Sequence, residues 1–129
     1  MLVNVDENGL ALGGYDPISY VDGVPAPGTD QQTSKHAGAT YRFASPEHKL
    51  KFDTDPDGHV PRYGGYCAFA ASQNRLTPGD PQVWRIIDGQ LLLFANTDFR
   101  DQFEKDPQGN RQKADANWPG LVAKYGKLN

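Results

Sequence analysis

The sequence predicts a single α+β domain, residues 1–129, in which hairpins form a small antiparallel sheet and several short helices pack on it. Val83–Ile87 and Gln90–Phe94 are apolar runs joined by Asp88-Gly89, a typical two-residue hairpin turn. Asp16-Pro17 and Ser45-Pro46 each join a helix-capping residue to a proline suited to the first helical position. With 129 residues, 37% of them hydrophobic, the chain is long enough to bury one core.

The first half is expected to hold one hairpin between two helices. Asp16-Pro17 begins a short helix through 18–20, and the glycines and prolines of 21–30 indicate an irregular connection. Residues 32–35 and 39–44 are expected to pair around His36-Ala37-Gly38, with a half-buried second strand. Ser45-Pro46 then begins a helix that runs to about Asp55.

The second half is expected to add a helix, a hairpin and further helices. The pair Gly64-Gly65 permits a sharp turn, and the Ala-rich run after it favours a helix with Cys67 in its first turn. Leu91–Phe94 is expected to be a strand buried on both sides. Asn96 or Thr97 caps another helix, and Pro119 is expected to divide the last segment into two short helices. No internal repeat is expected.

Composition excludes several classes of partner. The formal charge is −3, and basic residues do not cluster as a nucleic-acid or anionic-membrane surface requires. No apolar run approaches the roughly 18–20 residues of a membrane span, so we expect no membrane insertion. The first nine residues lack the layout of a signal peptide, although Met1 could replace a trimmed leader. A single cysteine excludes an intrachain disulfide and multi-cysteine metal sites.

Cys67 is the first candidate site residue. At the N-terminus of a helix, the partial positive charge of the backbone favours the thiolate, which binds metals or attacks electrophiles. The alternative is that Cys67 is a structural residue, because free cysteines are often buried as small hydrophobic side chains.

His48 and Asp16 are the second and third candidates. His48 shares a helix face with Phe52 four residues on, so we expect it at the rim of the core. His36 and His59 fall in a turn and a loop, where solvent exposure is expected. A thiolate with an imidazole suits a copper or zinc ion, although a rim histidine can also be structural and Asp16 can simply cap its helix.

Tyr15, Tyr63 and Tyr66 are candidates for lining a pocket, with a role at the edge of the core as the alternative. The chain lacks the common catalytic and nucleotide-binding motifs, such as His-Glu-x-x-His, Gly-x-Ser-x-Gly and the phosphate-binding loop. That absence favours a non-enzymatic role and leaves a dispersed catalytic site open.

Four ordered blocks resemble bacterial stand-alone YHS domain-containing proteins: Gly14–Tyr20, Tyr41–His48, Tyr63–Ala68 and Ala116–Pro119. The resemblance covers most of the chain, about 13–119, and implies one YHS-like domain. Related domains are attached to copper- and heavy-metal-transporting ATPases and to bacterial monooxygenases, so the resemblance implies metal binding of the copper type. Many stand-alone members look exported, which implies a periplasmic location if a leader was trimmed and leaves the cytoplasm open.

The chain departs from the metal-associated branch of that family in one respect. That branch carries extra cysteines, including one beside the Phe-Ser step, which here is Phe43-Ala44-Ser45. A metal site would therefore use Cys67 with His48, and Asp16 or a tyrosine as a further ligand. Two alternatives stay open: a non-enzymatic module for a protein or small ligand, with Cys67 structural, and a thiol-dependent redox protein.

Overall fold

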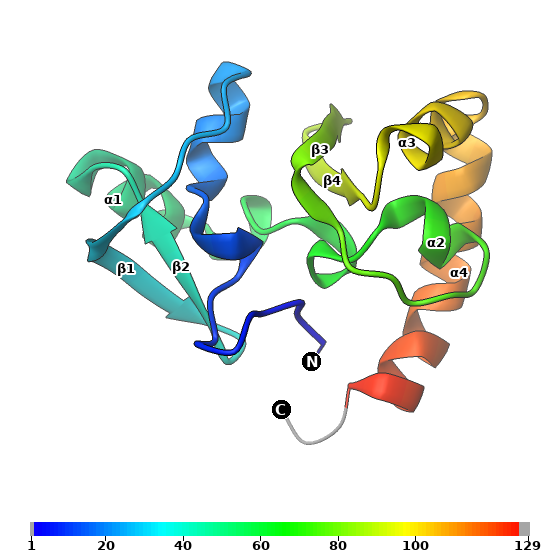
Figure 1. Ribbon diagram of the computed structural model, residues 1–129, viewed down its shortest axis with the longest axis horizontal. Coiled ribbons are helices and arrows are strands. Elements are labelled where there is room, and N and C mark those ends of the chain that lie inside the picture. The colour runs from blue at the N-terminus through cyan, green and yellow to red at the C-terminus, as the bar shows by residue number, and fades with distance from the viewer. Residues whose placement is uncertain (1, 127–129) are drawn as a thin grey trace.

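The computed structural model describes residues 2–126, and it confirms the α+β class. The chain forms two halves that lie side by side, each with one antiparallel hairpin and short helices (Figure 1). The strands therefore make two two-stranded sheets, where the sequence predicts one small sheet. No helix within 2–126 is long and apolar enough to cross a membrane.

The elements of the first half follow the sequence prediction closely. Two 3₁₀ turns, η1 (Leu12–Gly14) and η2 (Pro17–Asp22), precede the hairpin of β1 (Thr29–His36) and β2 (Ala39–Phe43). Helix α1 (Pro46–Thr54) begins after Ser45, whose hydroxyl accepts a hydrogen bond from the His48 backbone N–H. The predicted caps and hairpin are confirmed here.

The second half repeats this order and then adds a long helix. The turn η3 (Pro56–Gly58) ends the first half. In the second half, η4 (Arg62–Gly65) leads to α2 (Ala68–Ser72), the hairpin of β3 (Asp80–Ile87) and β4 (Gln90–Phe94), and α3 (Thr97–Glu104). Helix α4 (Pro107–Tyr125) closes the chain against α2 (Figure 1).

The two halves are copies of one structural unit. We define the first unit as residues 12–58 and the second unit as residues 63–109, each residue of the second being numbered 51 above its counterpart. The strand registers correspond without insertion, since Ser34 opposite Tyr41 matches Arg85 opposite Leu92. The prediction of no internal repeat is therefore wrong.

The identical residues of the two units lie mostly at turns and caps. They are Gly13-Gly14-Tyr15 and Gly64-Gly65-Tyr66, Pro27-Gly28 and Pro78-Gly79, Gln31 and Gln82, Gly38 and Gly89, Phe43-Ala44 and Phe94-Ala95, Phe52 and Phe103, Asp55-Pro56 and Asp106-Pro107, and Gly58 and Gly109. The backbone explains their placement, because both Gly-Gly turns have positive φ throughout and both hairpin turns have positive φ at their two central residues. Side chains between these positions have diverged, which hides the repeat in the sequence.

The core has two hydrophobic clusters that share strand β4. Leu91 and Leu93 face the first cluster with Tyr41, Phe43 and Phe52 of the first unit. Leu92 and Phe94 face the second cluster, which is built on α2, α3 and α4. The prediction that 91–94 is buried on both sides is thus confirmed, and the same alternation joins the two units into one body.

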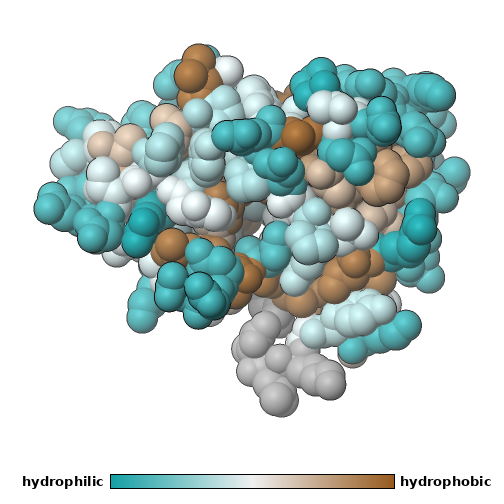
Figure 2. All heavy atoms as spheres, in the orientation of Figure 1, coloured by the Kyte–Doolittle hydropathy of each residue, from teal (hydrophilic) through white to brown (hydrophobic). Residues whose placement is uncertain are grey.

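The face in Figure 2 is hydrophilic over the outer edges of both units.

Helix α4 contradicts the prediction of two short helices divided at Pro119. Proline removes one backbone hydrogen bond at a cost of about 3 kcal/mol. Pro119 and Asp115, one turn before it, are both exposed, so water can solvate the carbonyl that is left free. Ala114 and Leu121 are buried against the second cluster, and their packing outweighs the local cost.

Candidate ligand-binding cleft

Asp16 and His48 are in direct contact. The Asp16 side chain is fully buried and its Oδ2 lies 2.5 Å from Nδ1 of His48, whose side chain is 30% exposed. Oδ1 accepts from the Ile18 N–H at 2.8 Å, and Oδ2 also accepts from the Ala44 N–H at 2.9 Å. Asp16 therefore caps η2 as predicted and also ties that turn to β2 and α1. His48 lies at the core's rim, as predicted.

Cys67 lies apart from this pair, in the second hydrophobic cluster. It is fully buried, and its Sγ accepts from the Ala70 N–H at 3.5 Å. It is the N-cap of α2, one position before the helix, whereas the sequence prediction placed it in the first turn. Within residues 2–126, no three His, Cys, Asp or Glu side chains group in a way that could hold a metal ion. The predicted ligands Cys67, His48 and Asp16 are thus not assembled into one site.

The repeat explains the position of Cys67. Cys67 is the counterpart of Asp16, and Phe99 is the counterpart of His48. The backbone N–H of Asp16 donates to Ala26, and that of Cys67 donates to the equivalent Thr77, both at 2.8 Å. The first unit therefore carries a polar pair where the second unit carries two apolar side chains, and Cys67 performs the capping and packing role of its position.

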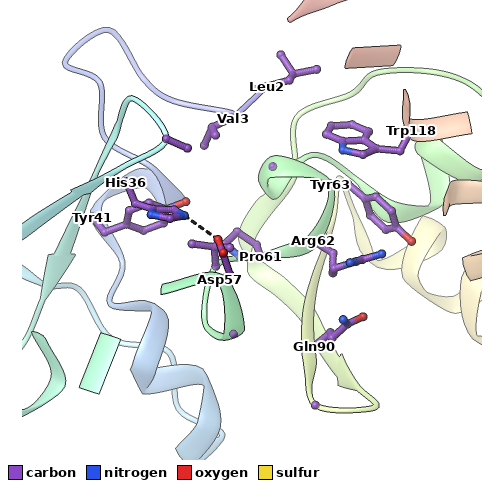
Figure 3. A pocket seen from close by; sticks show the side chains of 15 residues that line it. Leu2, Val3, His36, Tyr41, Asp57, Pro61, Arg62, Tyr63, Gln90 and Trp118 are labelled. Atoms are coloured by element: carbon purple, nitrogen blue, oxygen red, sulfur yellow. Dashed lines mark hydrogen bonds and ion pairs between the residues drawn. The ribbon is translucent and has the colours of Figure 1, made fainter. Parts of the chain in front are cut away.

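A cleft of about 420 Å³ lies between the two units (Figure 3). Strands β1 and β2 contribute His36 and Tyr41 to one side, and Tyr63 and Trp118 form the opposite side. Leu2 and Val3 lie at one end, with Asp57, Arg62 and Gln90 toward the other. The cleft is thus amphipathic, with an apolar end and a polar end.

The aromatic walls are held by packing within each unit. The Tyr41 ring lies 5.1 Å from that of Phe52, and the Tyr63 ring lies 5.7 Å from that of Trp118 in an edge-to-face arrangement. Burial raises the pKa of Tyr41 to about 12. Burial, together with the hydrogen bond to Asp115, raises the pKa of Tyr63 to about 12. Both phenols are therefore neutral at physiological pH.

Two contacts fix polar side chains at the polar end of the cleft. Nε2 of His36 lies 2.9 Å from Oδ1 of Asp57, and Nη2 of Arg62 lies 2.8 Å from Oδ1 of Asp115. The same Asp115 oxygen accepts from the Tyr63 hydroxyl at 2.8 Å. These bonds hold the side chains in place before any ligand arrives.

Of the three tyrosines predicted to line a pocket, only Tyr63 lines this cleft. The Tyr15 hydroxyl accepts from Gln82 Nε2 at 2.7 Å, away from the cleft, and Tyr66 packs beside Trp118 at a ring distance of 6.3 Å. Burial raises the pKa of Tyr66. The sequence prediction missed Tyr41 and Trp118 as lining residues and took His36 for an exposed turn residue. His59 bonds locally, through Nδ1 to the Asp55 carbonyl at 2.9 Å.

Comparison with protein-family models, curated proteins and solved structures finds no match for this chain. The resemblance to YHS domain-containing proteins accordingly stays a prediction from the four sequence blocks.

Proposed function

We propose that this chain is a non-enzymatic module that binds a small organic ligand in the cleft between its two units. One observation carries the proposal: the cleft has about 420 Å³ of space, mostly apolar and aromatic walls, and a few polar groups at one end. Small-molecule sites usually have this volume and this composition, and they often lie between structural units. The alternative of a module with a structural Cys67 agrees with the burial of that residue.

The supporting argument is preorganisation. Tyr41 is on a strand, Trp118 is on the long helix α4, and Tyr63 is the first residue of a left-handed turn, with φ 55°. A non-glycine residue at positive φ costs free energy, and the same conformation at its counterpart Leu12 (φ 58°) indicates that the repeated turn holds this side chain in place. A ligand that enters this cleft would order few side chains, which favours binding.

Copper or zinc binding, the first expectation from the sequence, stays a prediction and has less geometric support. Cys67 is buried in one cluster, and the Asp16–His48 pair belongs to the other unit. A metal ion that used all three would require the units to rearrange. The periplasmic location and a protein partner likewise stay predictions from the resemblance.

The two tryptophans make a direct test of the cleft, because Trp118 lines it and Trp84 packs on Tyr20 at a ring distance of 5.4 Å. A fragment library is screened against ¹⁵N-labelled protein, and the two indole N–H resonances are followed. We expect fragments that shift the Trp118 resonance and leave Trp84 unchanged. A screen whose hits shift Trp84 alone, or neither indole, would contradict the proposal.

A variant of the cleft wall adds a second readout. Trp118→Ala should weaken the fragment hits about tenfold or more, because it removes one aromatic wall. Tyr125→Ala is the matched control, since Tyr125 is an exposed aromatic residue on the same helix and does not line the cleft. Circular dichroism of both variants verifies that the helix remains. Equal weakening by the two variants would place binding elsewhere.

A further inference from the structure

We propose that the ligand of this cleft is an uncharged, planar aromatic molecule with a hydrogen-bond acceptor at one end, such as an aryl amide or aryl ketone. This inference rests on the proposed function and adds the chemical class of the ligand. Three features of the cleft carry it: aromatic walls, charges that are solvated or already offset, and an amide donor left over.

The aromatic walls favour a flat ligand. Tyr41 lies on one side of the cleft and Tyr63 and Trp118 lie on the other, with Leu2 and Val3 at the apolar end (Figure 3). Because aromatic side chains favour offset-stacked and edge-to-face contacts, a planar ring between these walls can contact both sides. A branched aliphatic ligand of equal volume would gain fewer such contacts.

The charges of the cleft disfavour an ionic ligand. The lining residues that the structure describes include two charged side chains, Asp57 and Arg62. Asp57 is in hydrogen-bond contact with His36, and Arg62 forms an ion pair with Asp115. A carboxylate would compete with Asp115 for the guanidinium, and an ammonium would compete with His36 for the carboxylate. The Asp57 side chain is 88% exposed and solvated, and Asp115 already offsets the charge of Arg62. Either ion would therefore lose hydration on entry for a weak electrostatic gain, which is unfavourable.

Gln90 supplies the polar contact for a neutral acceptor. Its Oε1 accepts from Nη2 of Arg111, and Nη1 of Arg111 is held by Asp88 at 2.7 Å. This chain of contacts fixes the side-chain amide and uses its oxygen. The Nε2 group of Gln90 donates to no other residue within the described part of the chain, and Gln90 lies at the polar end of the cleft. Its two N–H bonds are therefore free for a ligand carbonyl.

Three probes that share one ring system and differ in charge test the ligand class. They are 2-naphthamide, 2-naphthoate and naphthalen-2-ylmethylammonium, titrated at neutral pH while the Trp118 and Trp84 indole resonances are recorded. We expect 2-naphthamide to shift Trp118 with a Kd about tenfold lower than that of either ion. If one of the ions binds as tightly as 2-naphthamide or more tightly, the proposed ligand class is wrong while the cleft remains a binding site. If no probe shifts Trp118 and fragments do not shift it either, the proposed function fails as well.

The role of Gln90 has its own variant. Gln90→Glu keeps an oxygen for Arg111 and removes the amide donors, so the affinity for 2-naphthamide should fall about fivefold to tenfold. Gln108→Glu is the matched control, because it introduces the same charge beside Asp88 and does not line the cleft. An unchanged Kd in Gln90→Glu, or an equal loss in Gln108→Glu, would overturn the assignment of Gln90.

Discussion

Asp16 and Cys67 occupy the same position in the two units: each follows a Gly-Gly-Tyr segment whose glycines have positive φ, and each caps the short helix after it. Asp16 is hydrogen-bonded to His48, while Cys67 is packed among apolar side chains. The equivalence assigns Cys67 a structural role that its lone occurrence in the sequence does not reveal.

The Cys67 thiol should be unreactive in the folded protein. The side chain is fully buried in an apolar cluster, and inaccessible thiols of this kind are inert. Iodoacetamide at neutral pH should label Cys67 only at the rate of unfolding and should label it quickly in denaturant. The modification is measured by intact-protein mass spectrometry. Rapid labelling under native conditions would contradict the structural role and revive the thiol-dependent alternative.

Asp16→Ala should destabilise the protein by about 3 kcal/mol or more, because it leaves the N–H groups of Ile18 and Ala44 without a partner in a buried site. Urea unfolding followed by circular dichroism measures the loss. Asp57→Ala is the control, since Asp57 also pairs with a histidine but its side chain is 88% exposed, and it should cost under about 1 kcal/mol. Equal losses in the two variants would mean that the burial of Asp16 does not determine its contribution to the free energy of unfolding.

Gly64→Ala should destabilise the fold far more than Gly89→Ala. Both glycines have positive φ, so both substitutions carry a backbone cost of about 1–2 kcal/mol. A Cβ at Gly64 would also collide with the backbone carbonyl of Leu2, while a Cβ at Gly89 meets nothing within 4 Å. The difference between the urea midpoints of the two variants measures the cost of the contact between Gly64 and the Leu2 backbone. Similar midpoints would contradict that contact.

The sequence predicted the local elements well because their signals are local. The caps at Asp16, Ser45 and Asn96 and the turn at Asp88-Gly89 need only neighbouring residues, and the structure confirms them. Pro119 is the exception among these local signals. Whether it ends the helix depends on the packing of α4 against α2, which is distant in the chain, and the helix continues through it.

The candidate site was harder to predict for the same reason. The cleft joins residues as far apart as Leu2 and Trp118, and no spacing pattern relates them. The Asp16–His48 contact also joins two separate elements, η2 and α1, although the sequence indicated each residue as a candidate metal ligand. The repeat was the accessible signal that was missed: Gly-Gly-Tyr, Pro-Gly and Asp-Pro each recur at a constant spacing of 51 residues. Had it been found, it would have paired Cys67 with Asp16 and indicated a capping role.

Alkaline pH should destabilise the protein between about pH 10 and pH 12, partly through Tyr41. An unfolded chain ionises its tyrosines near pH 10, whereas burial raises the pKa of Tyr41 to about 12 in the folded state. Within that window the folded protein binds more protons than the unfolded chain, so the free energy of unfolding falls as pH rises. Below pH 10 this contribution is fully present.

Tyr41→Phe should remove that part of the pH dependence. By pH 12 the stability lost through Tyr41 is on the order of 2 kcal/mol, so the variant should lose stability less steeply than the wild type from pH 10 upward. Near neutral pH the two proteins should differ little, because the Tyr41 hydroxyl makes no hydrogen bond within the described residues. Urea unfolding at a series of pH values gives both curves, and parallel curves would show that the Tyr41 phenol does not titrate as its burial requires.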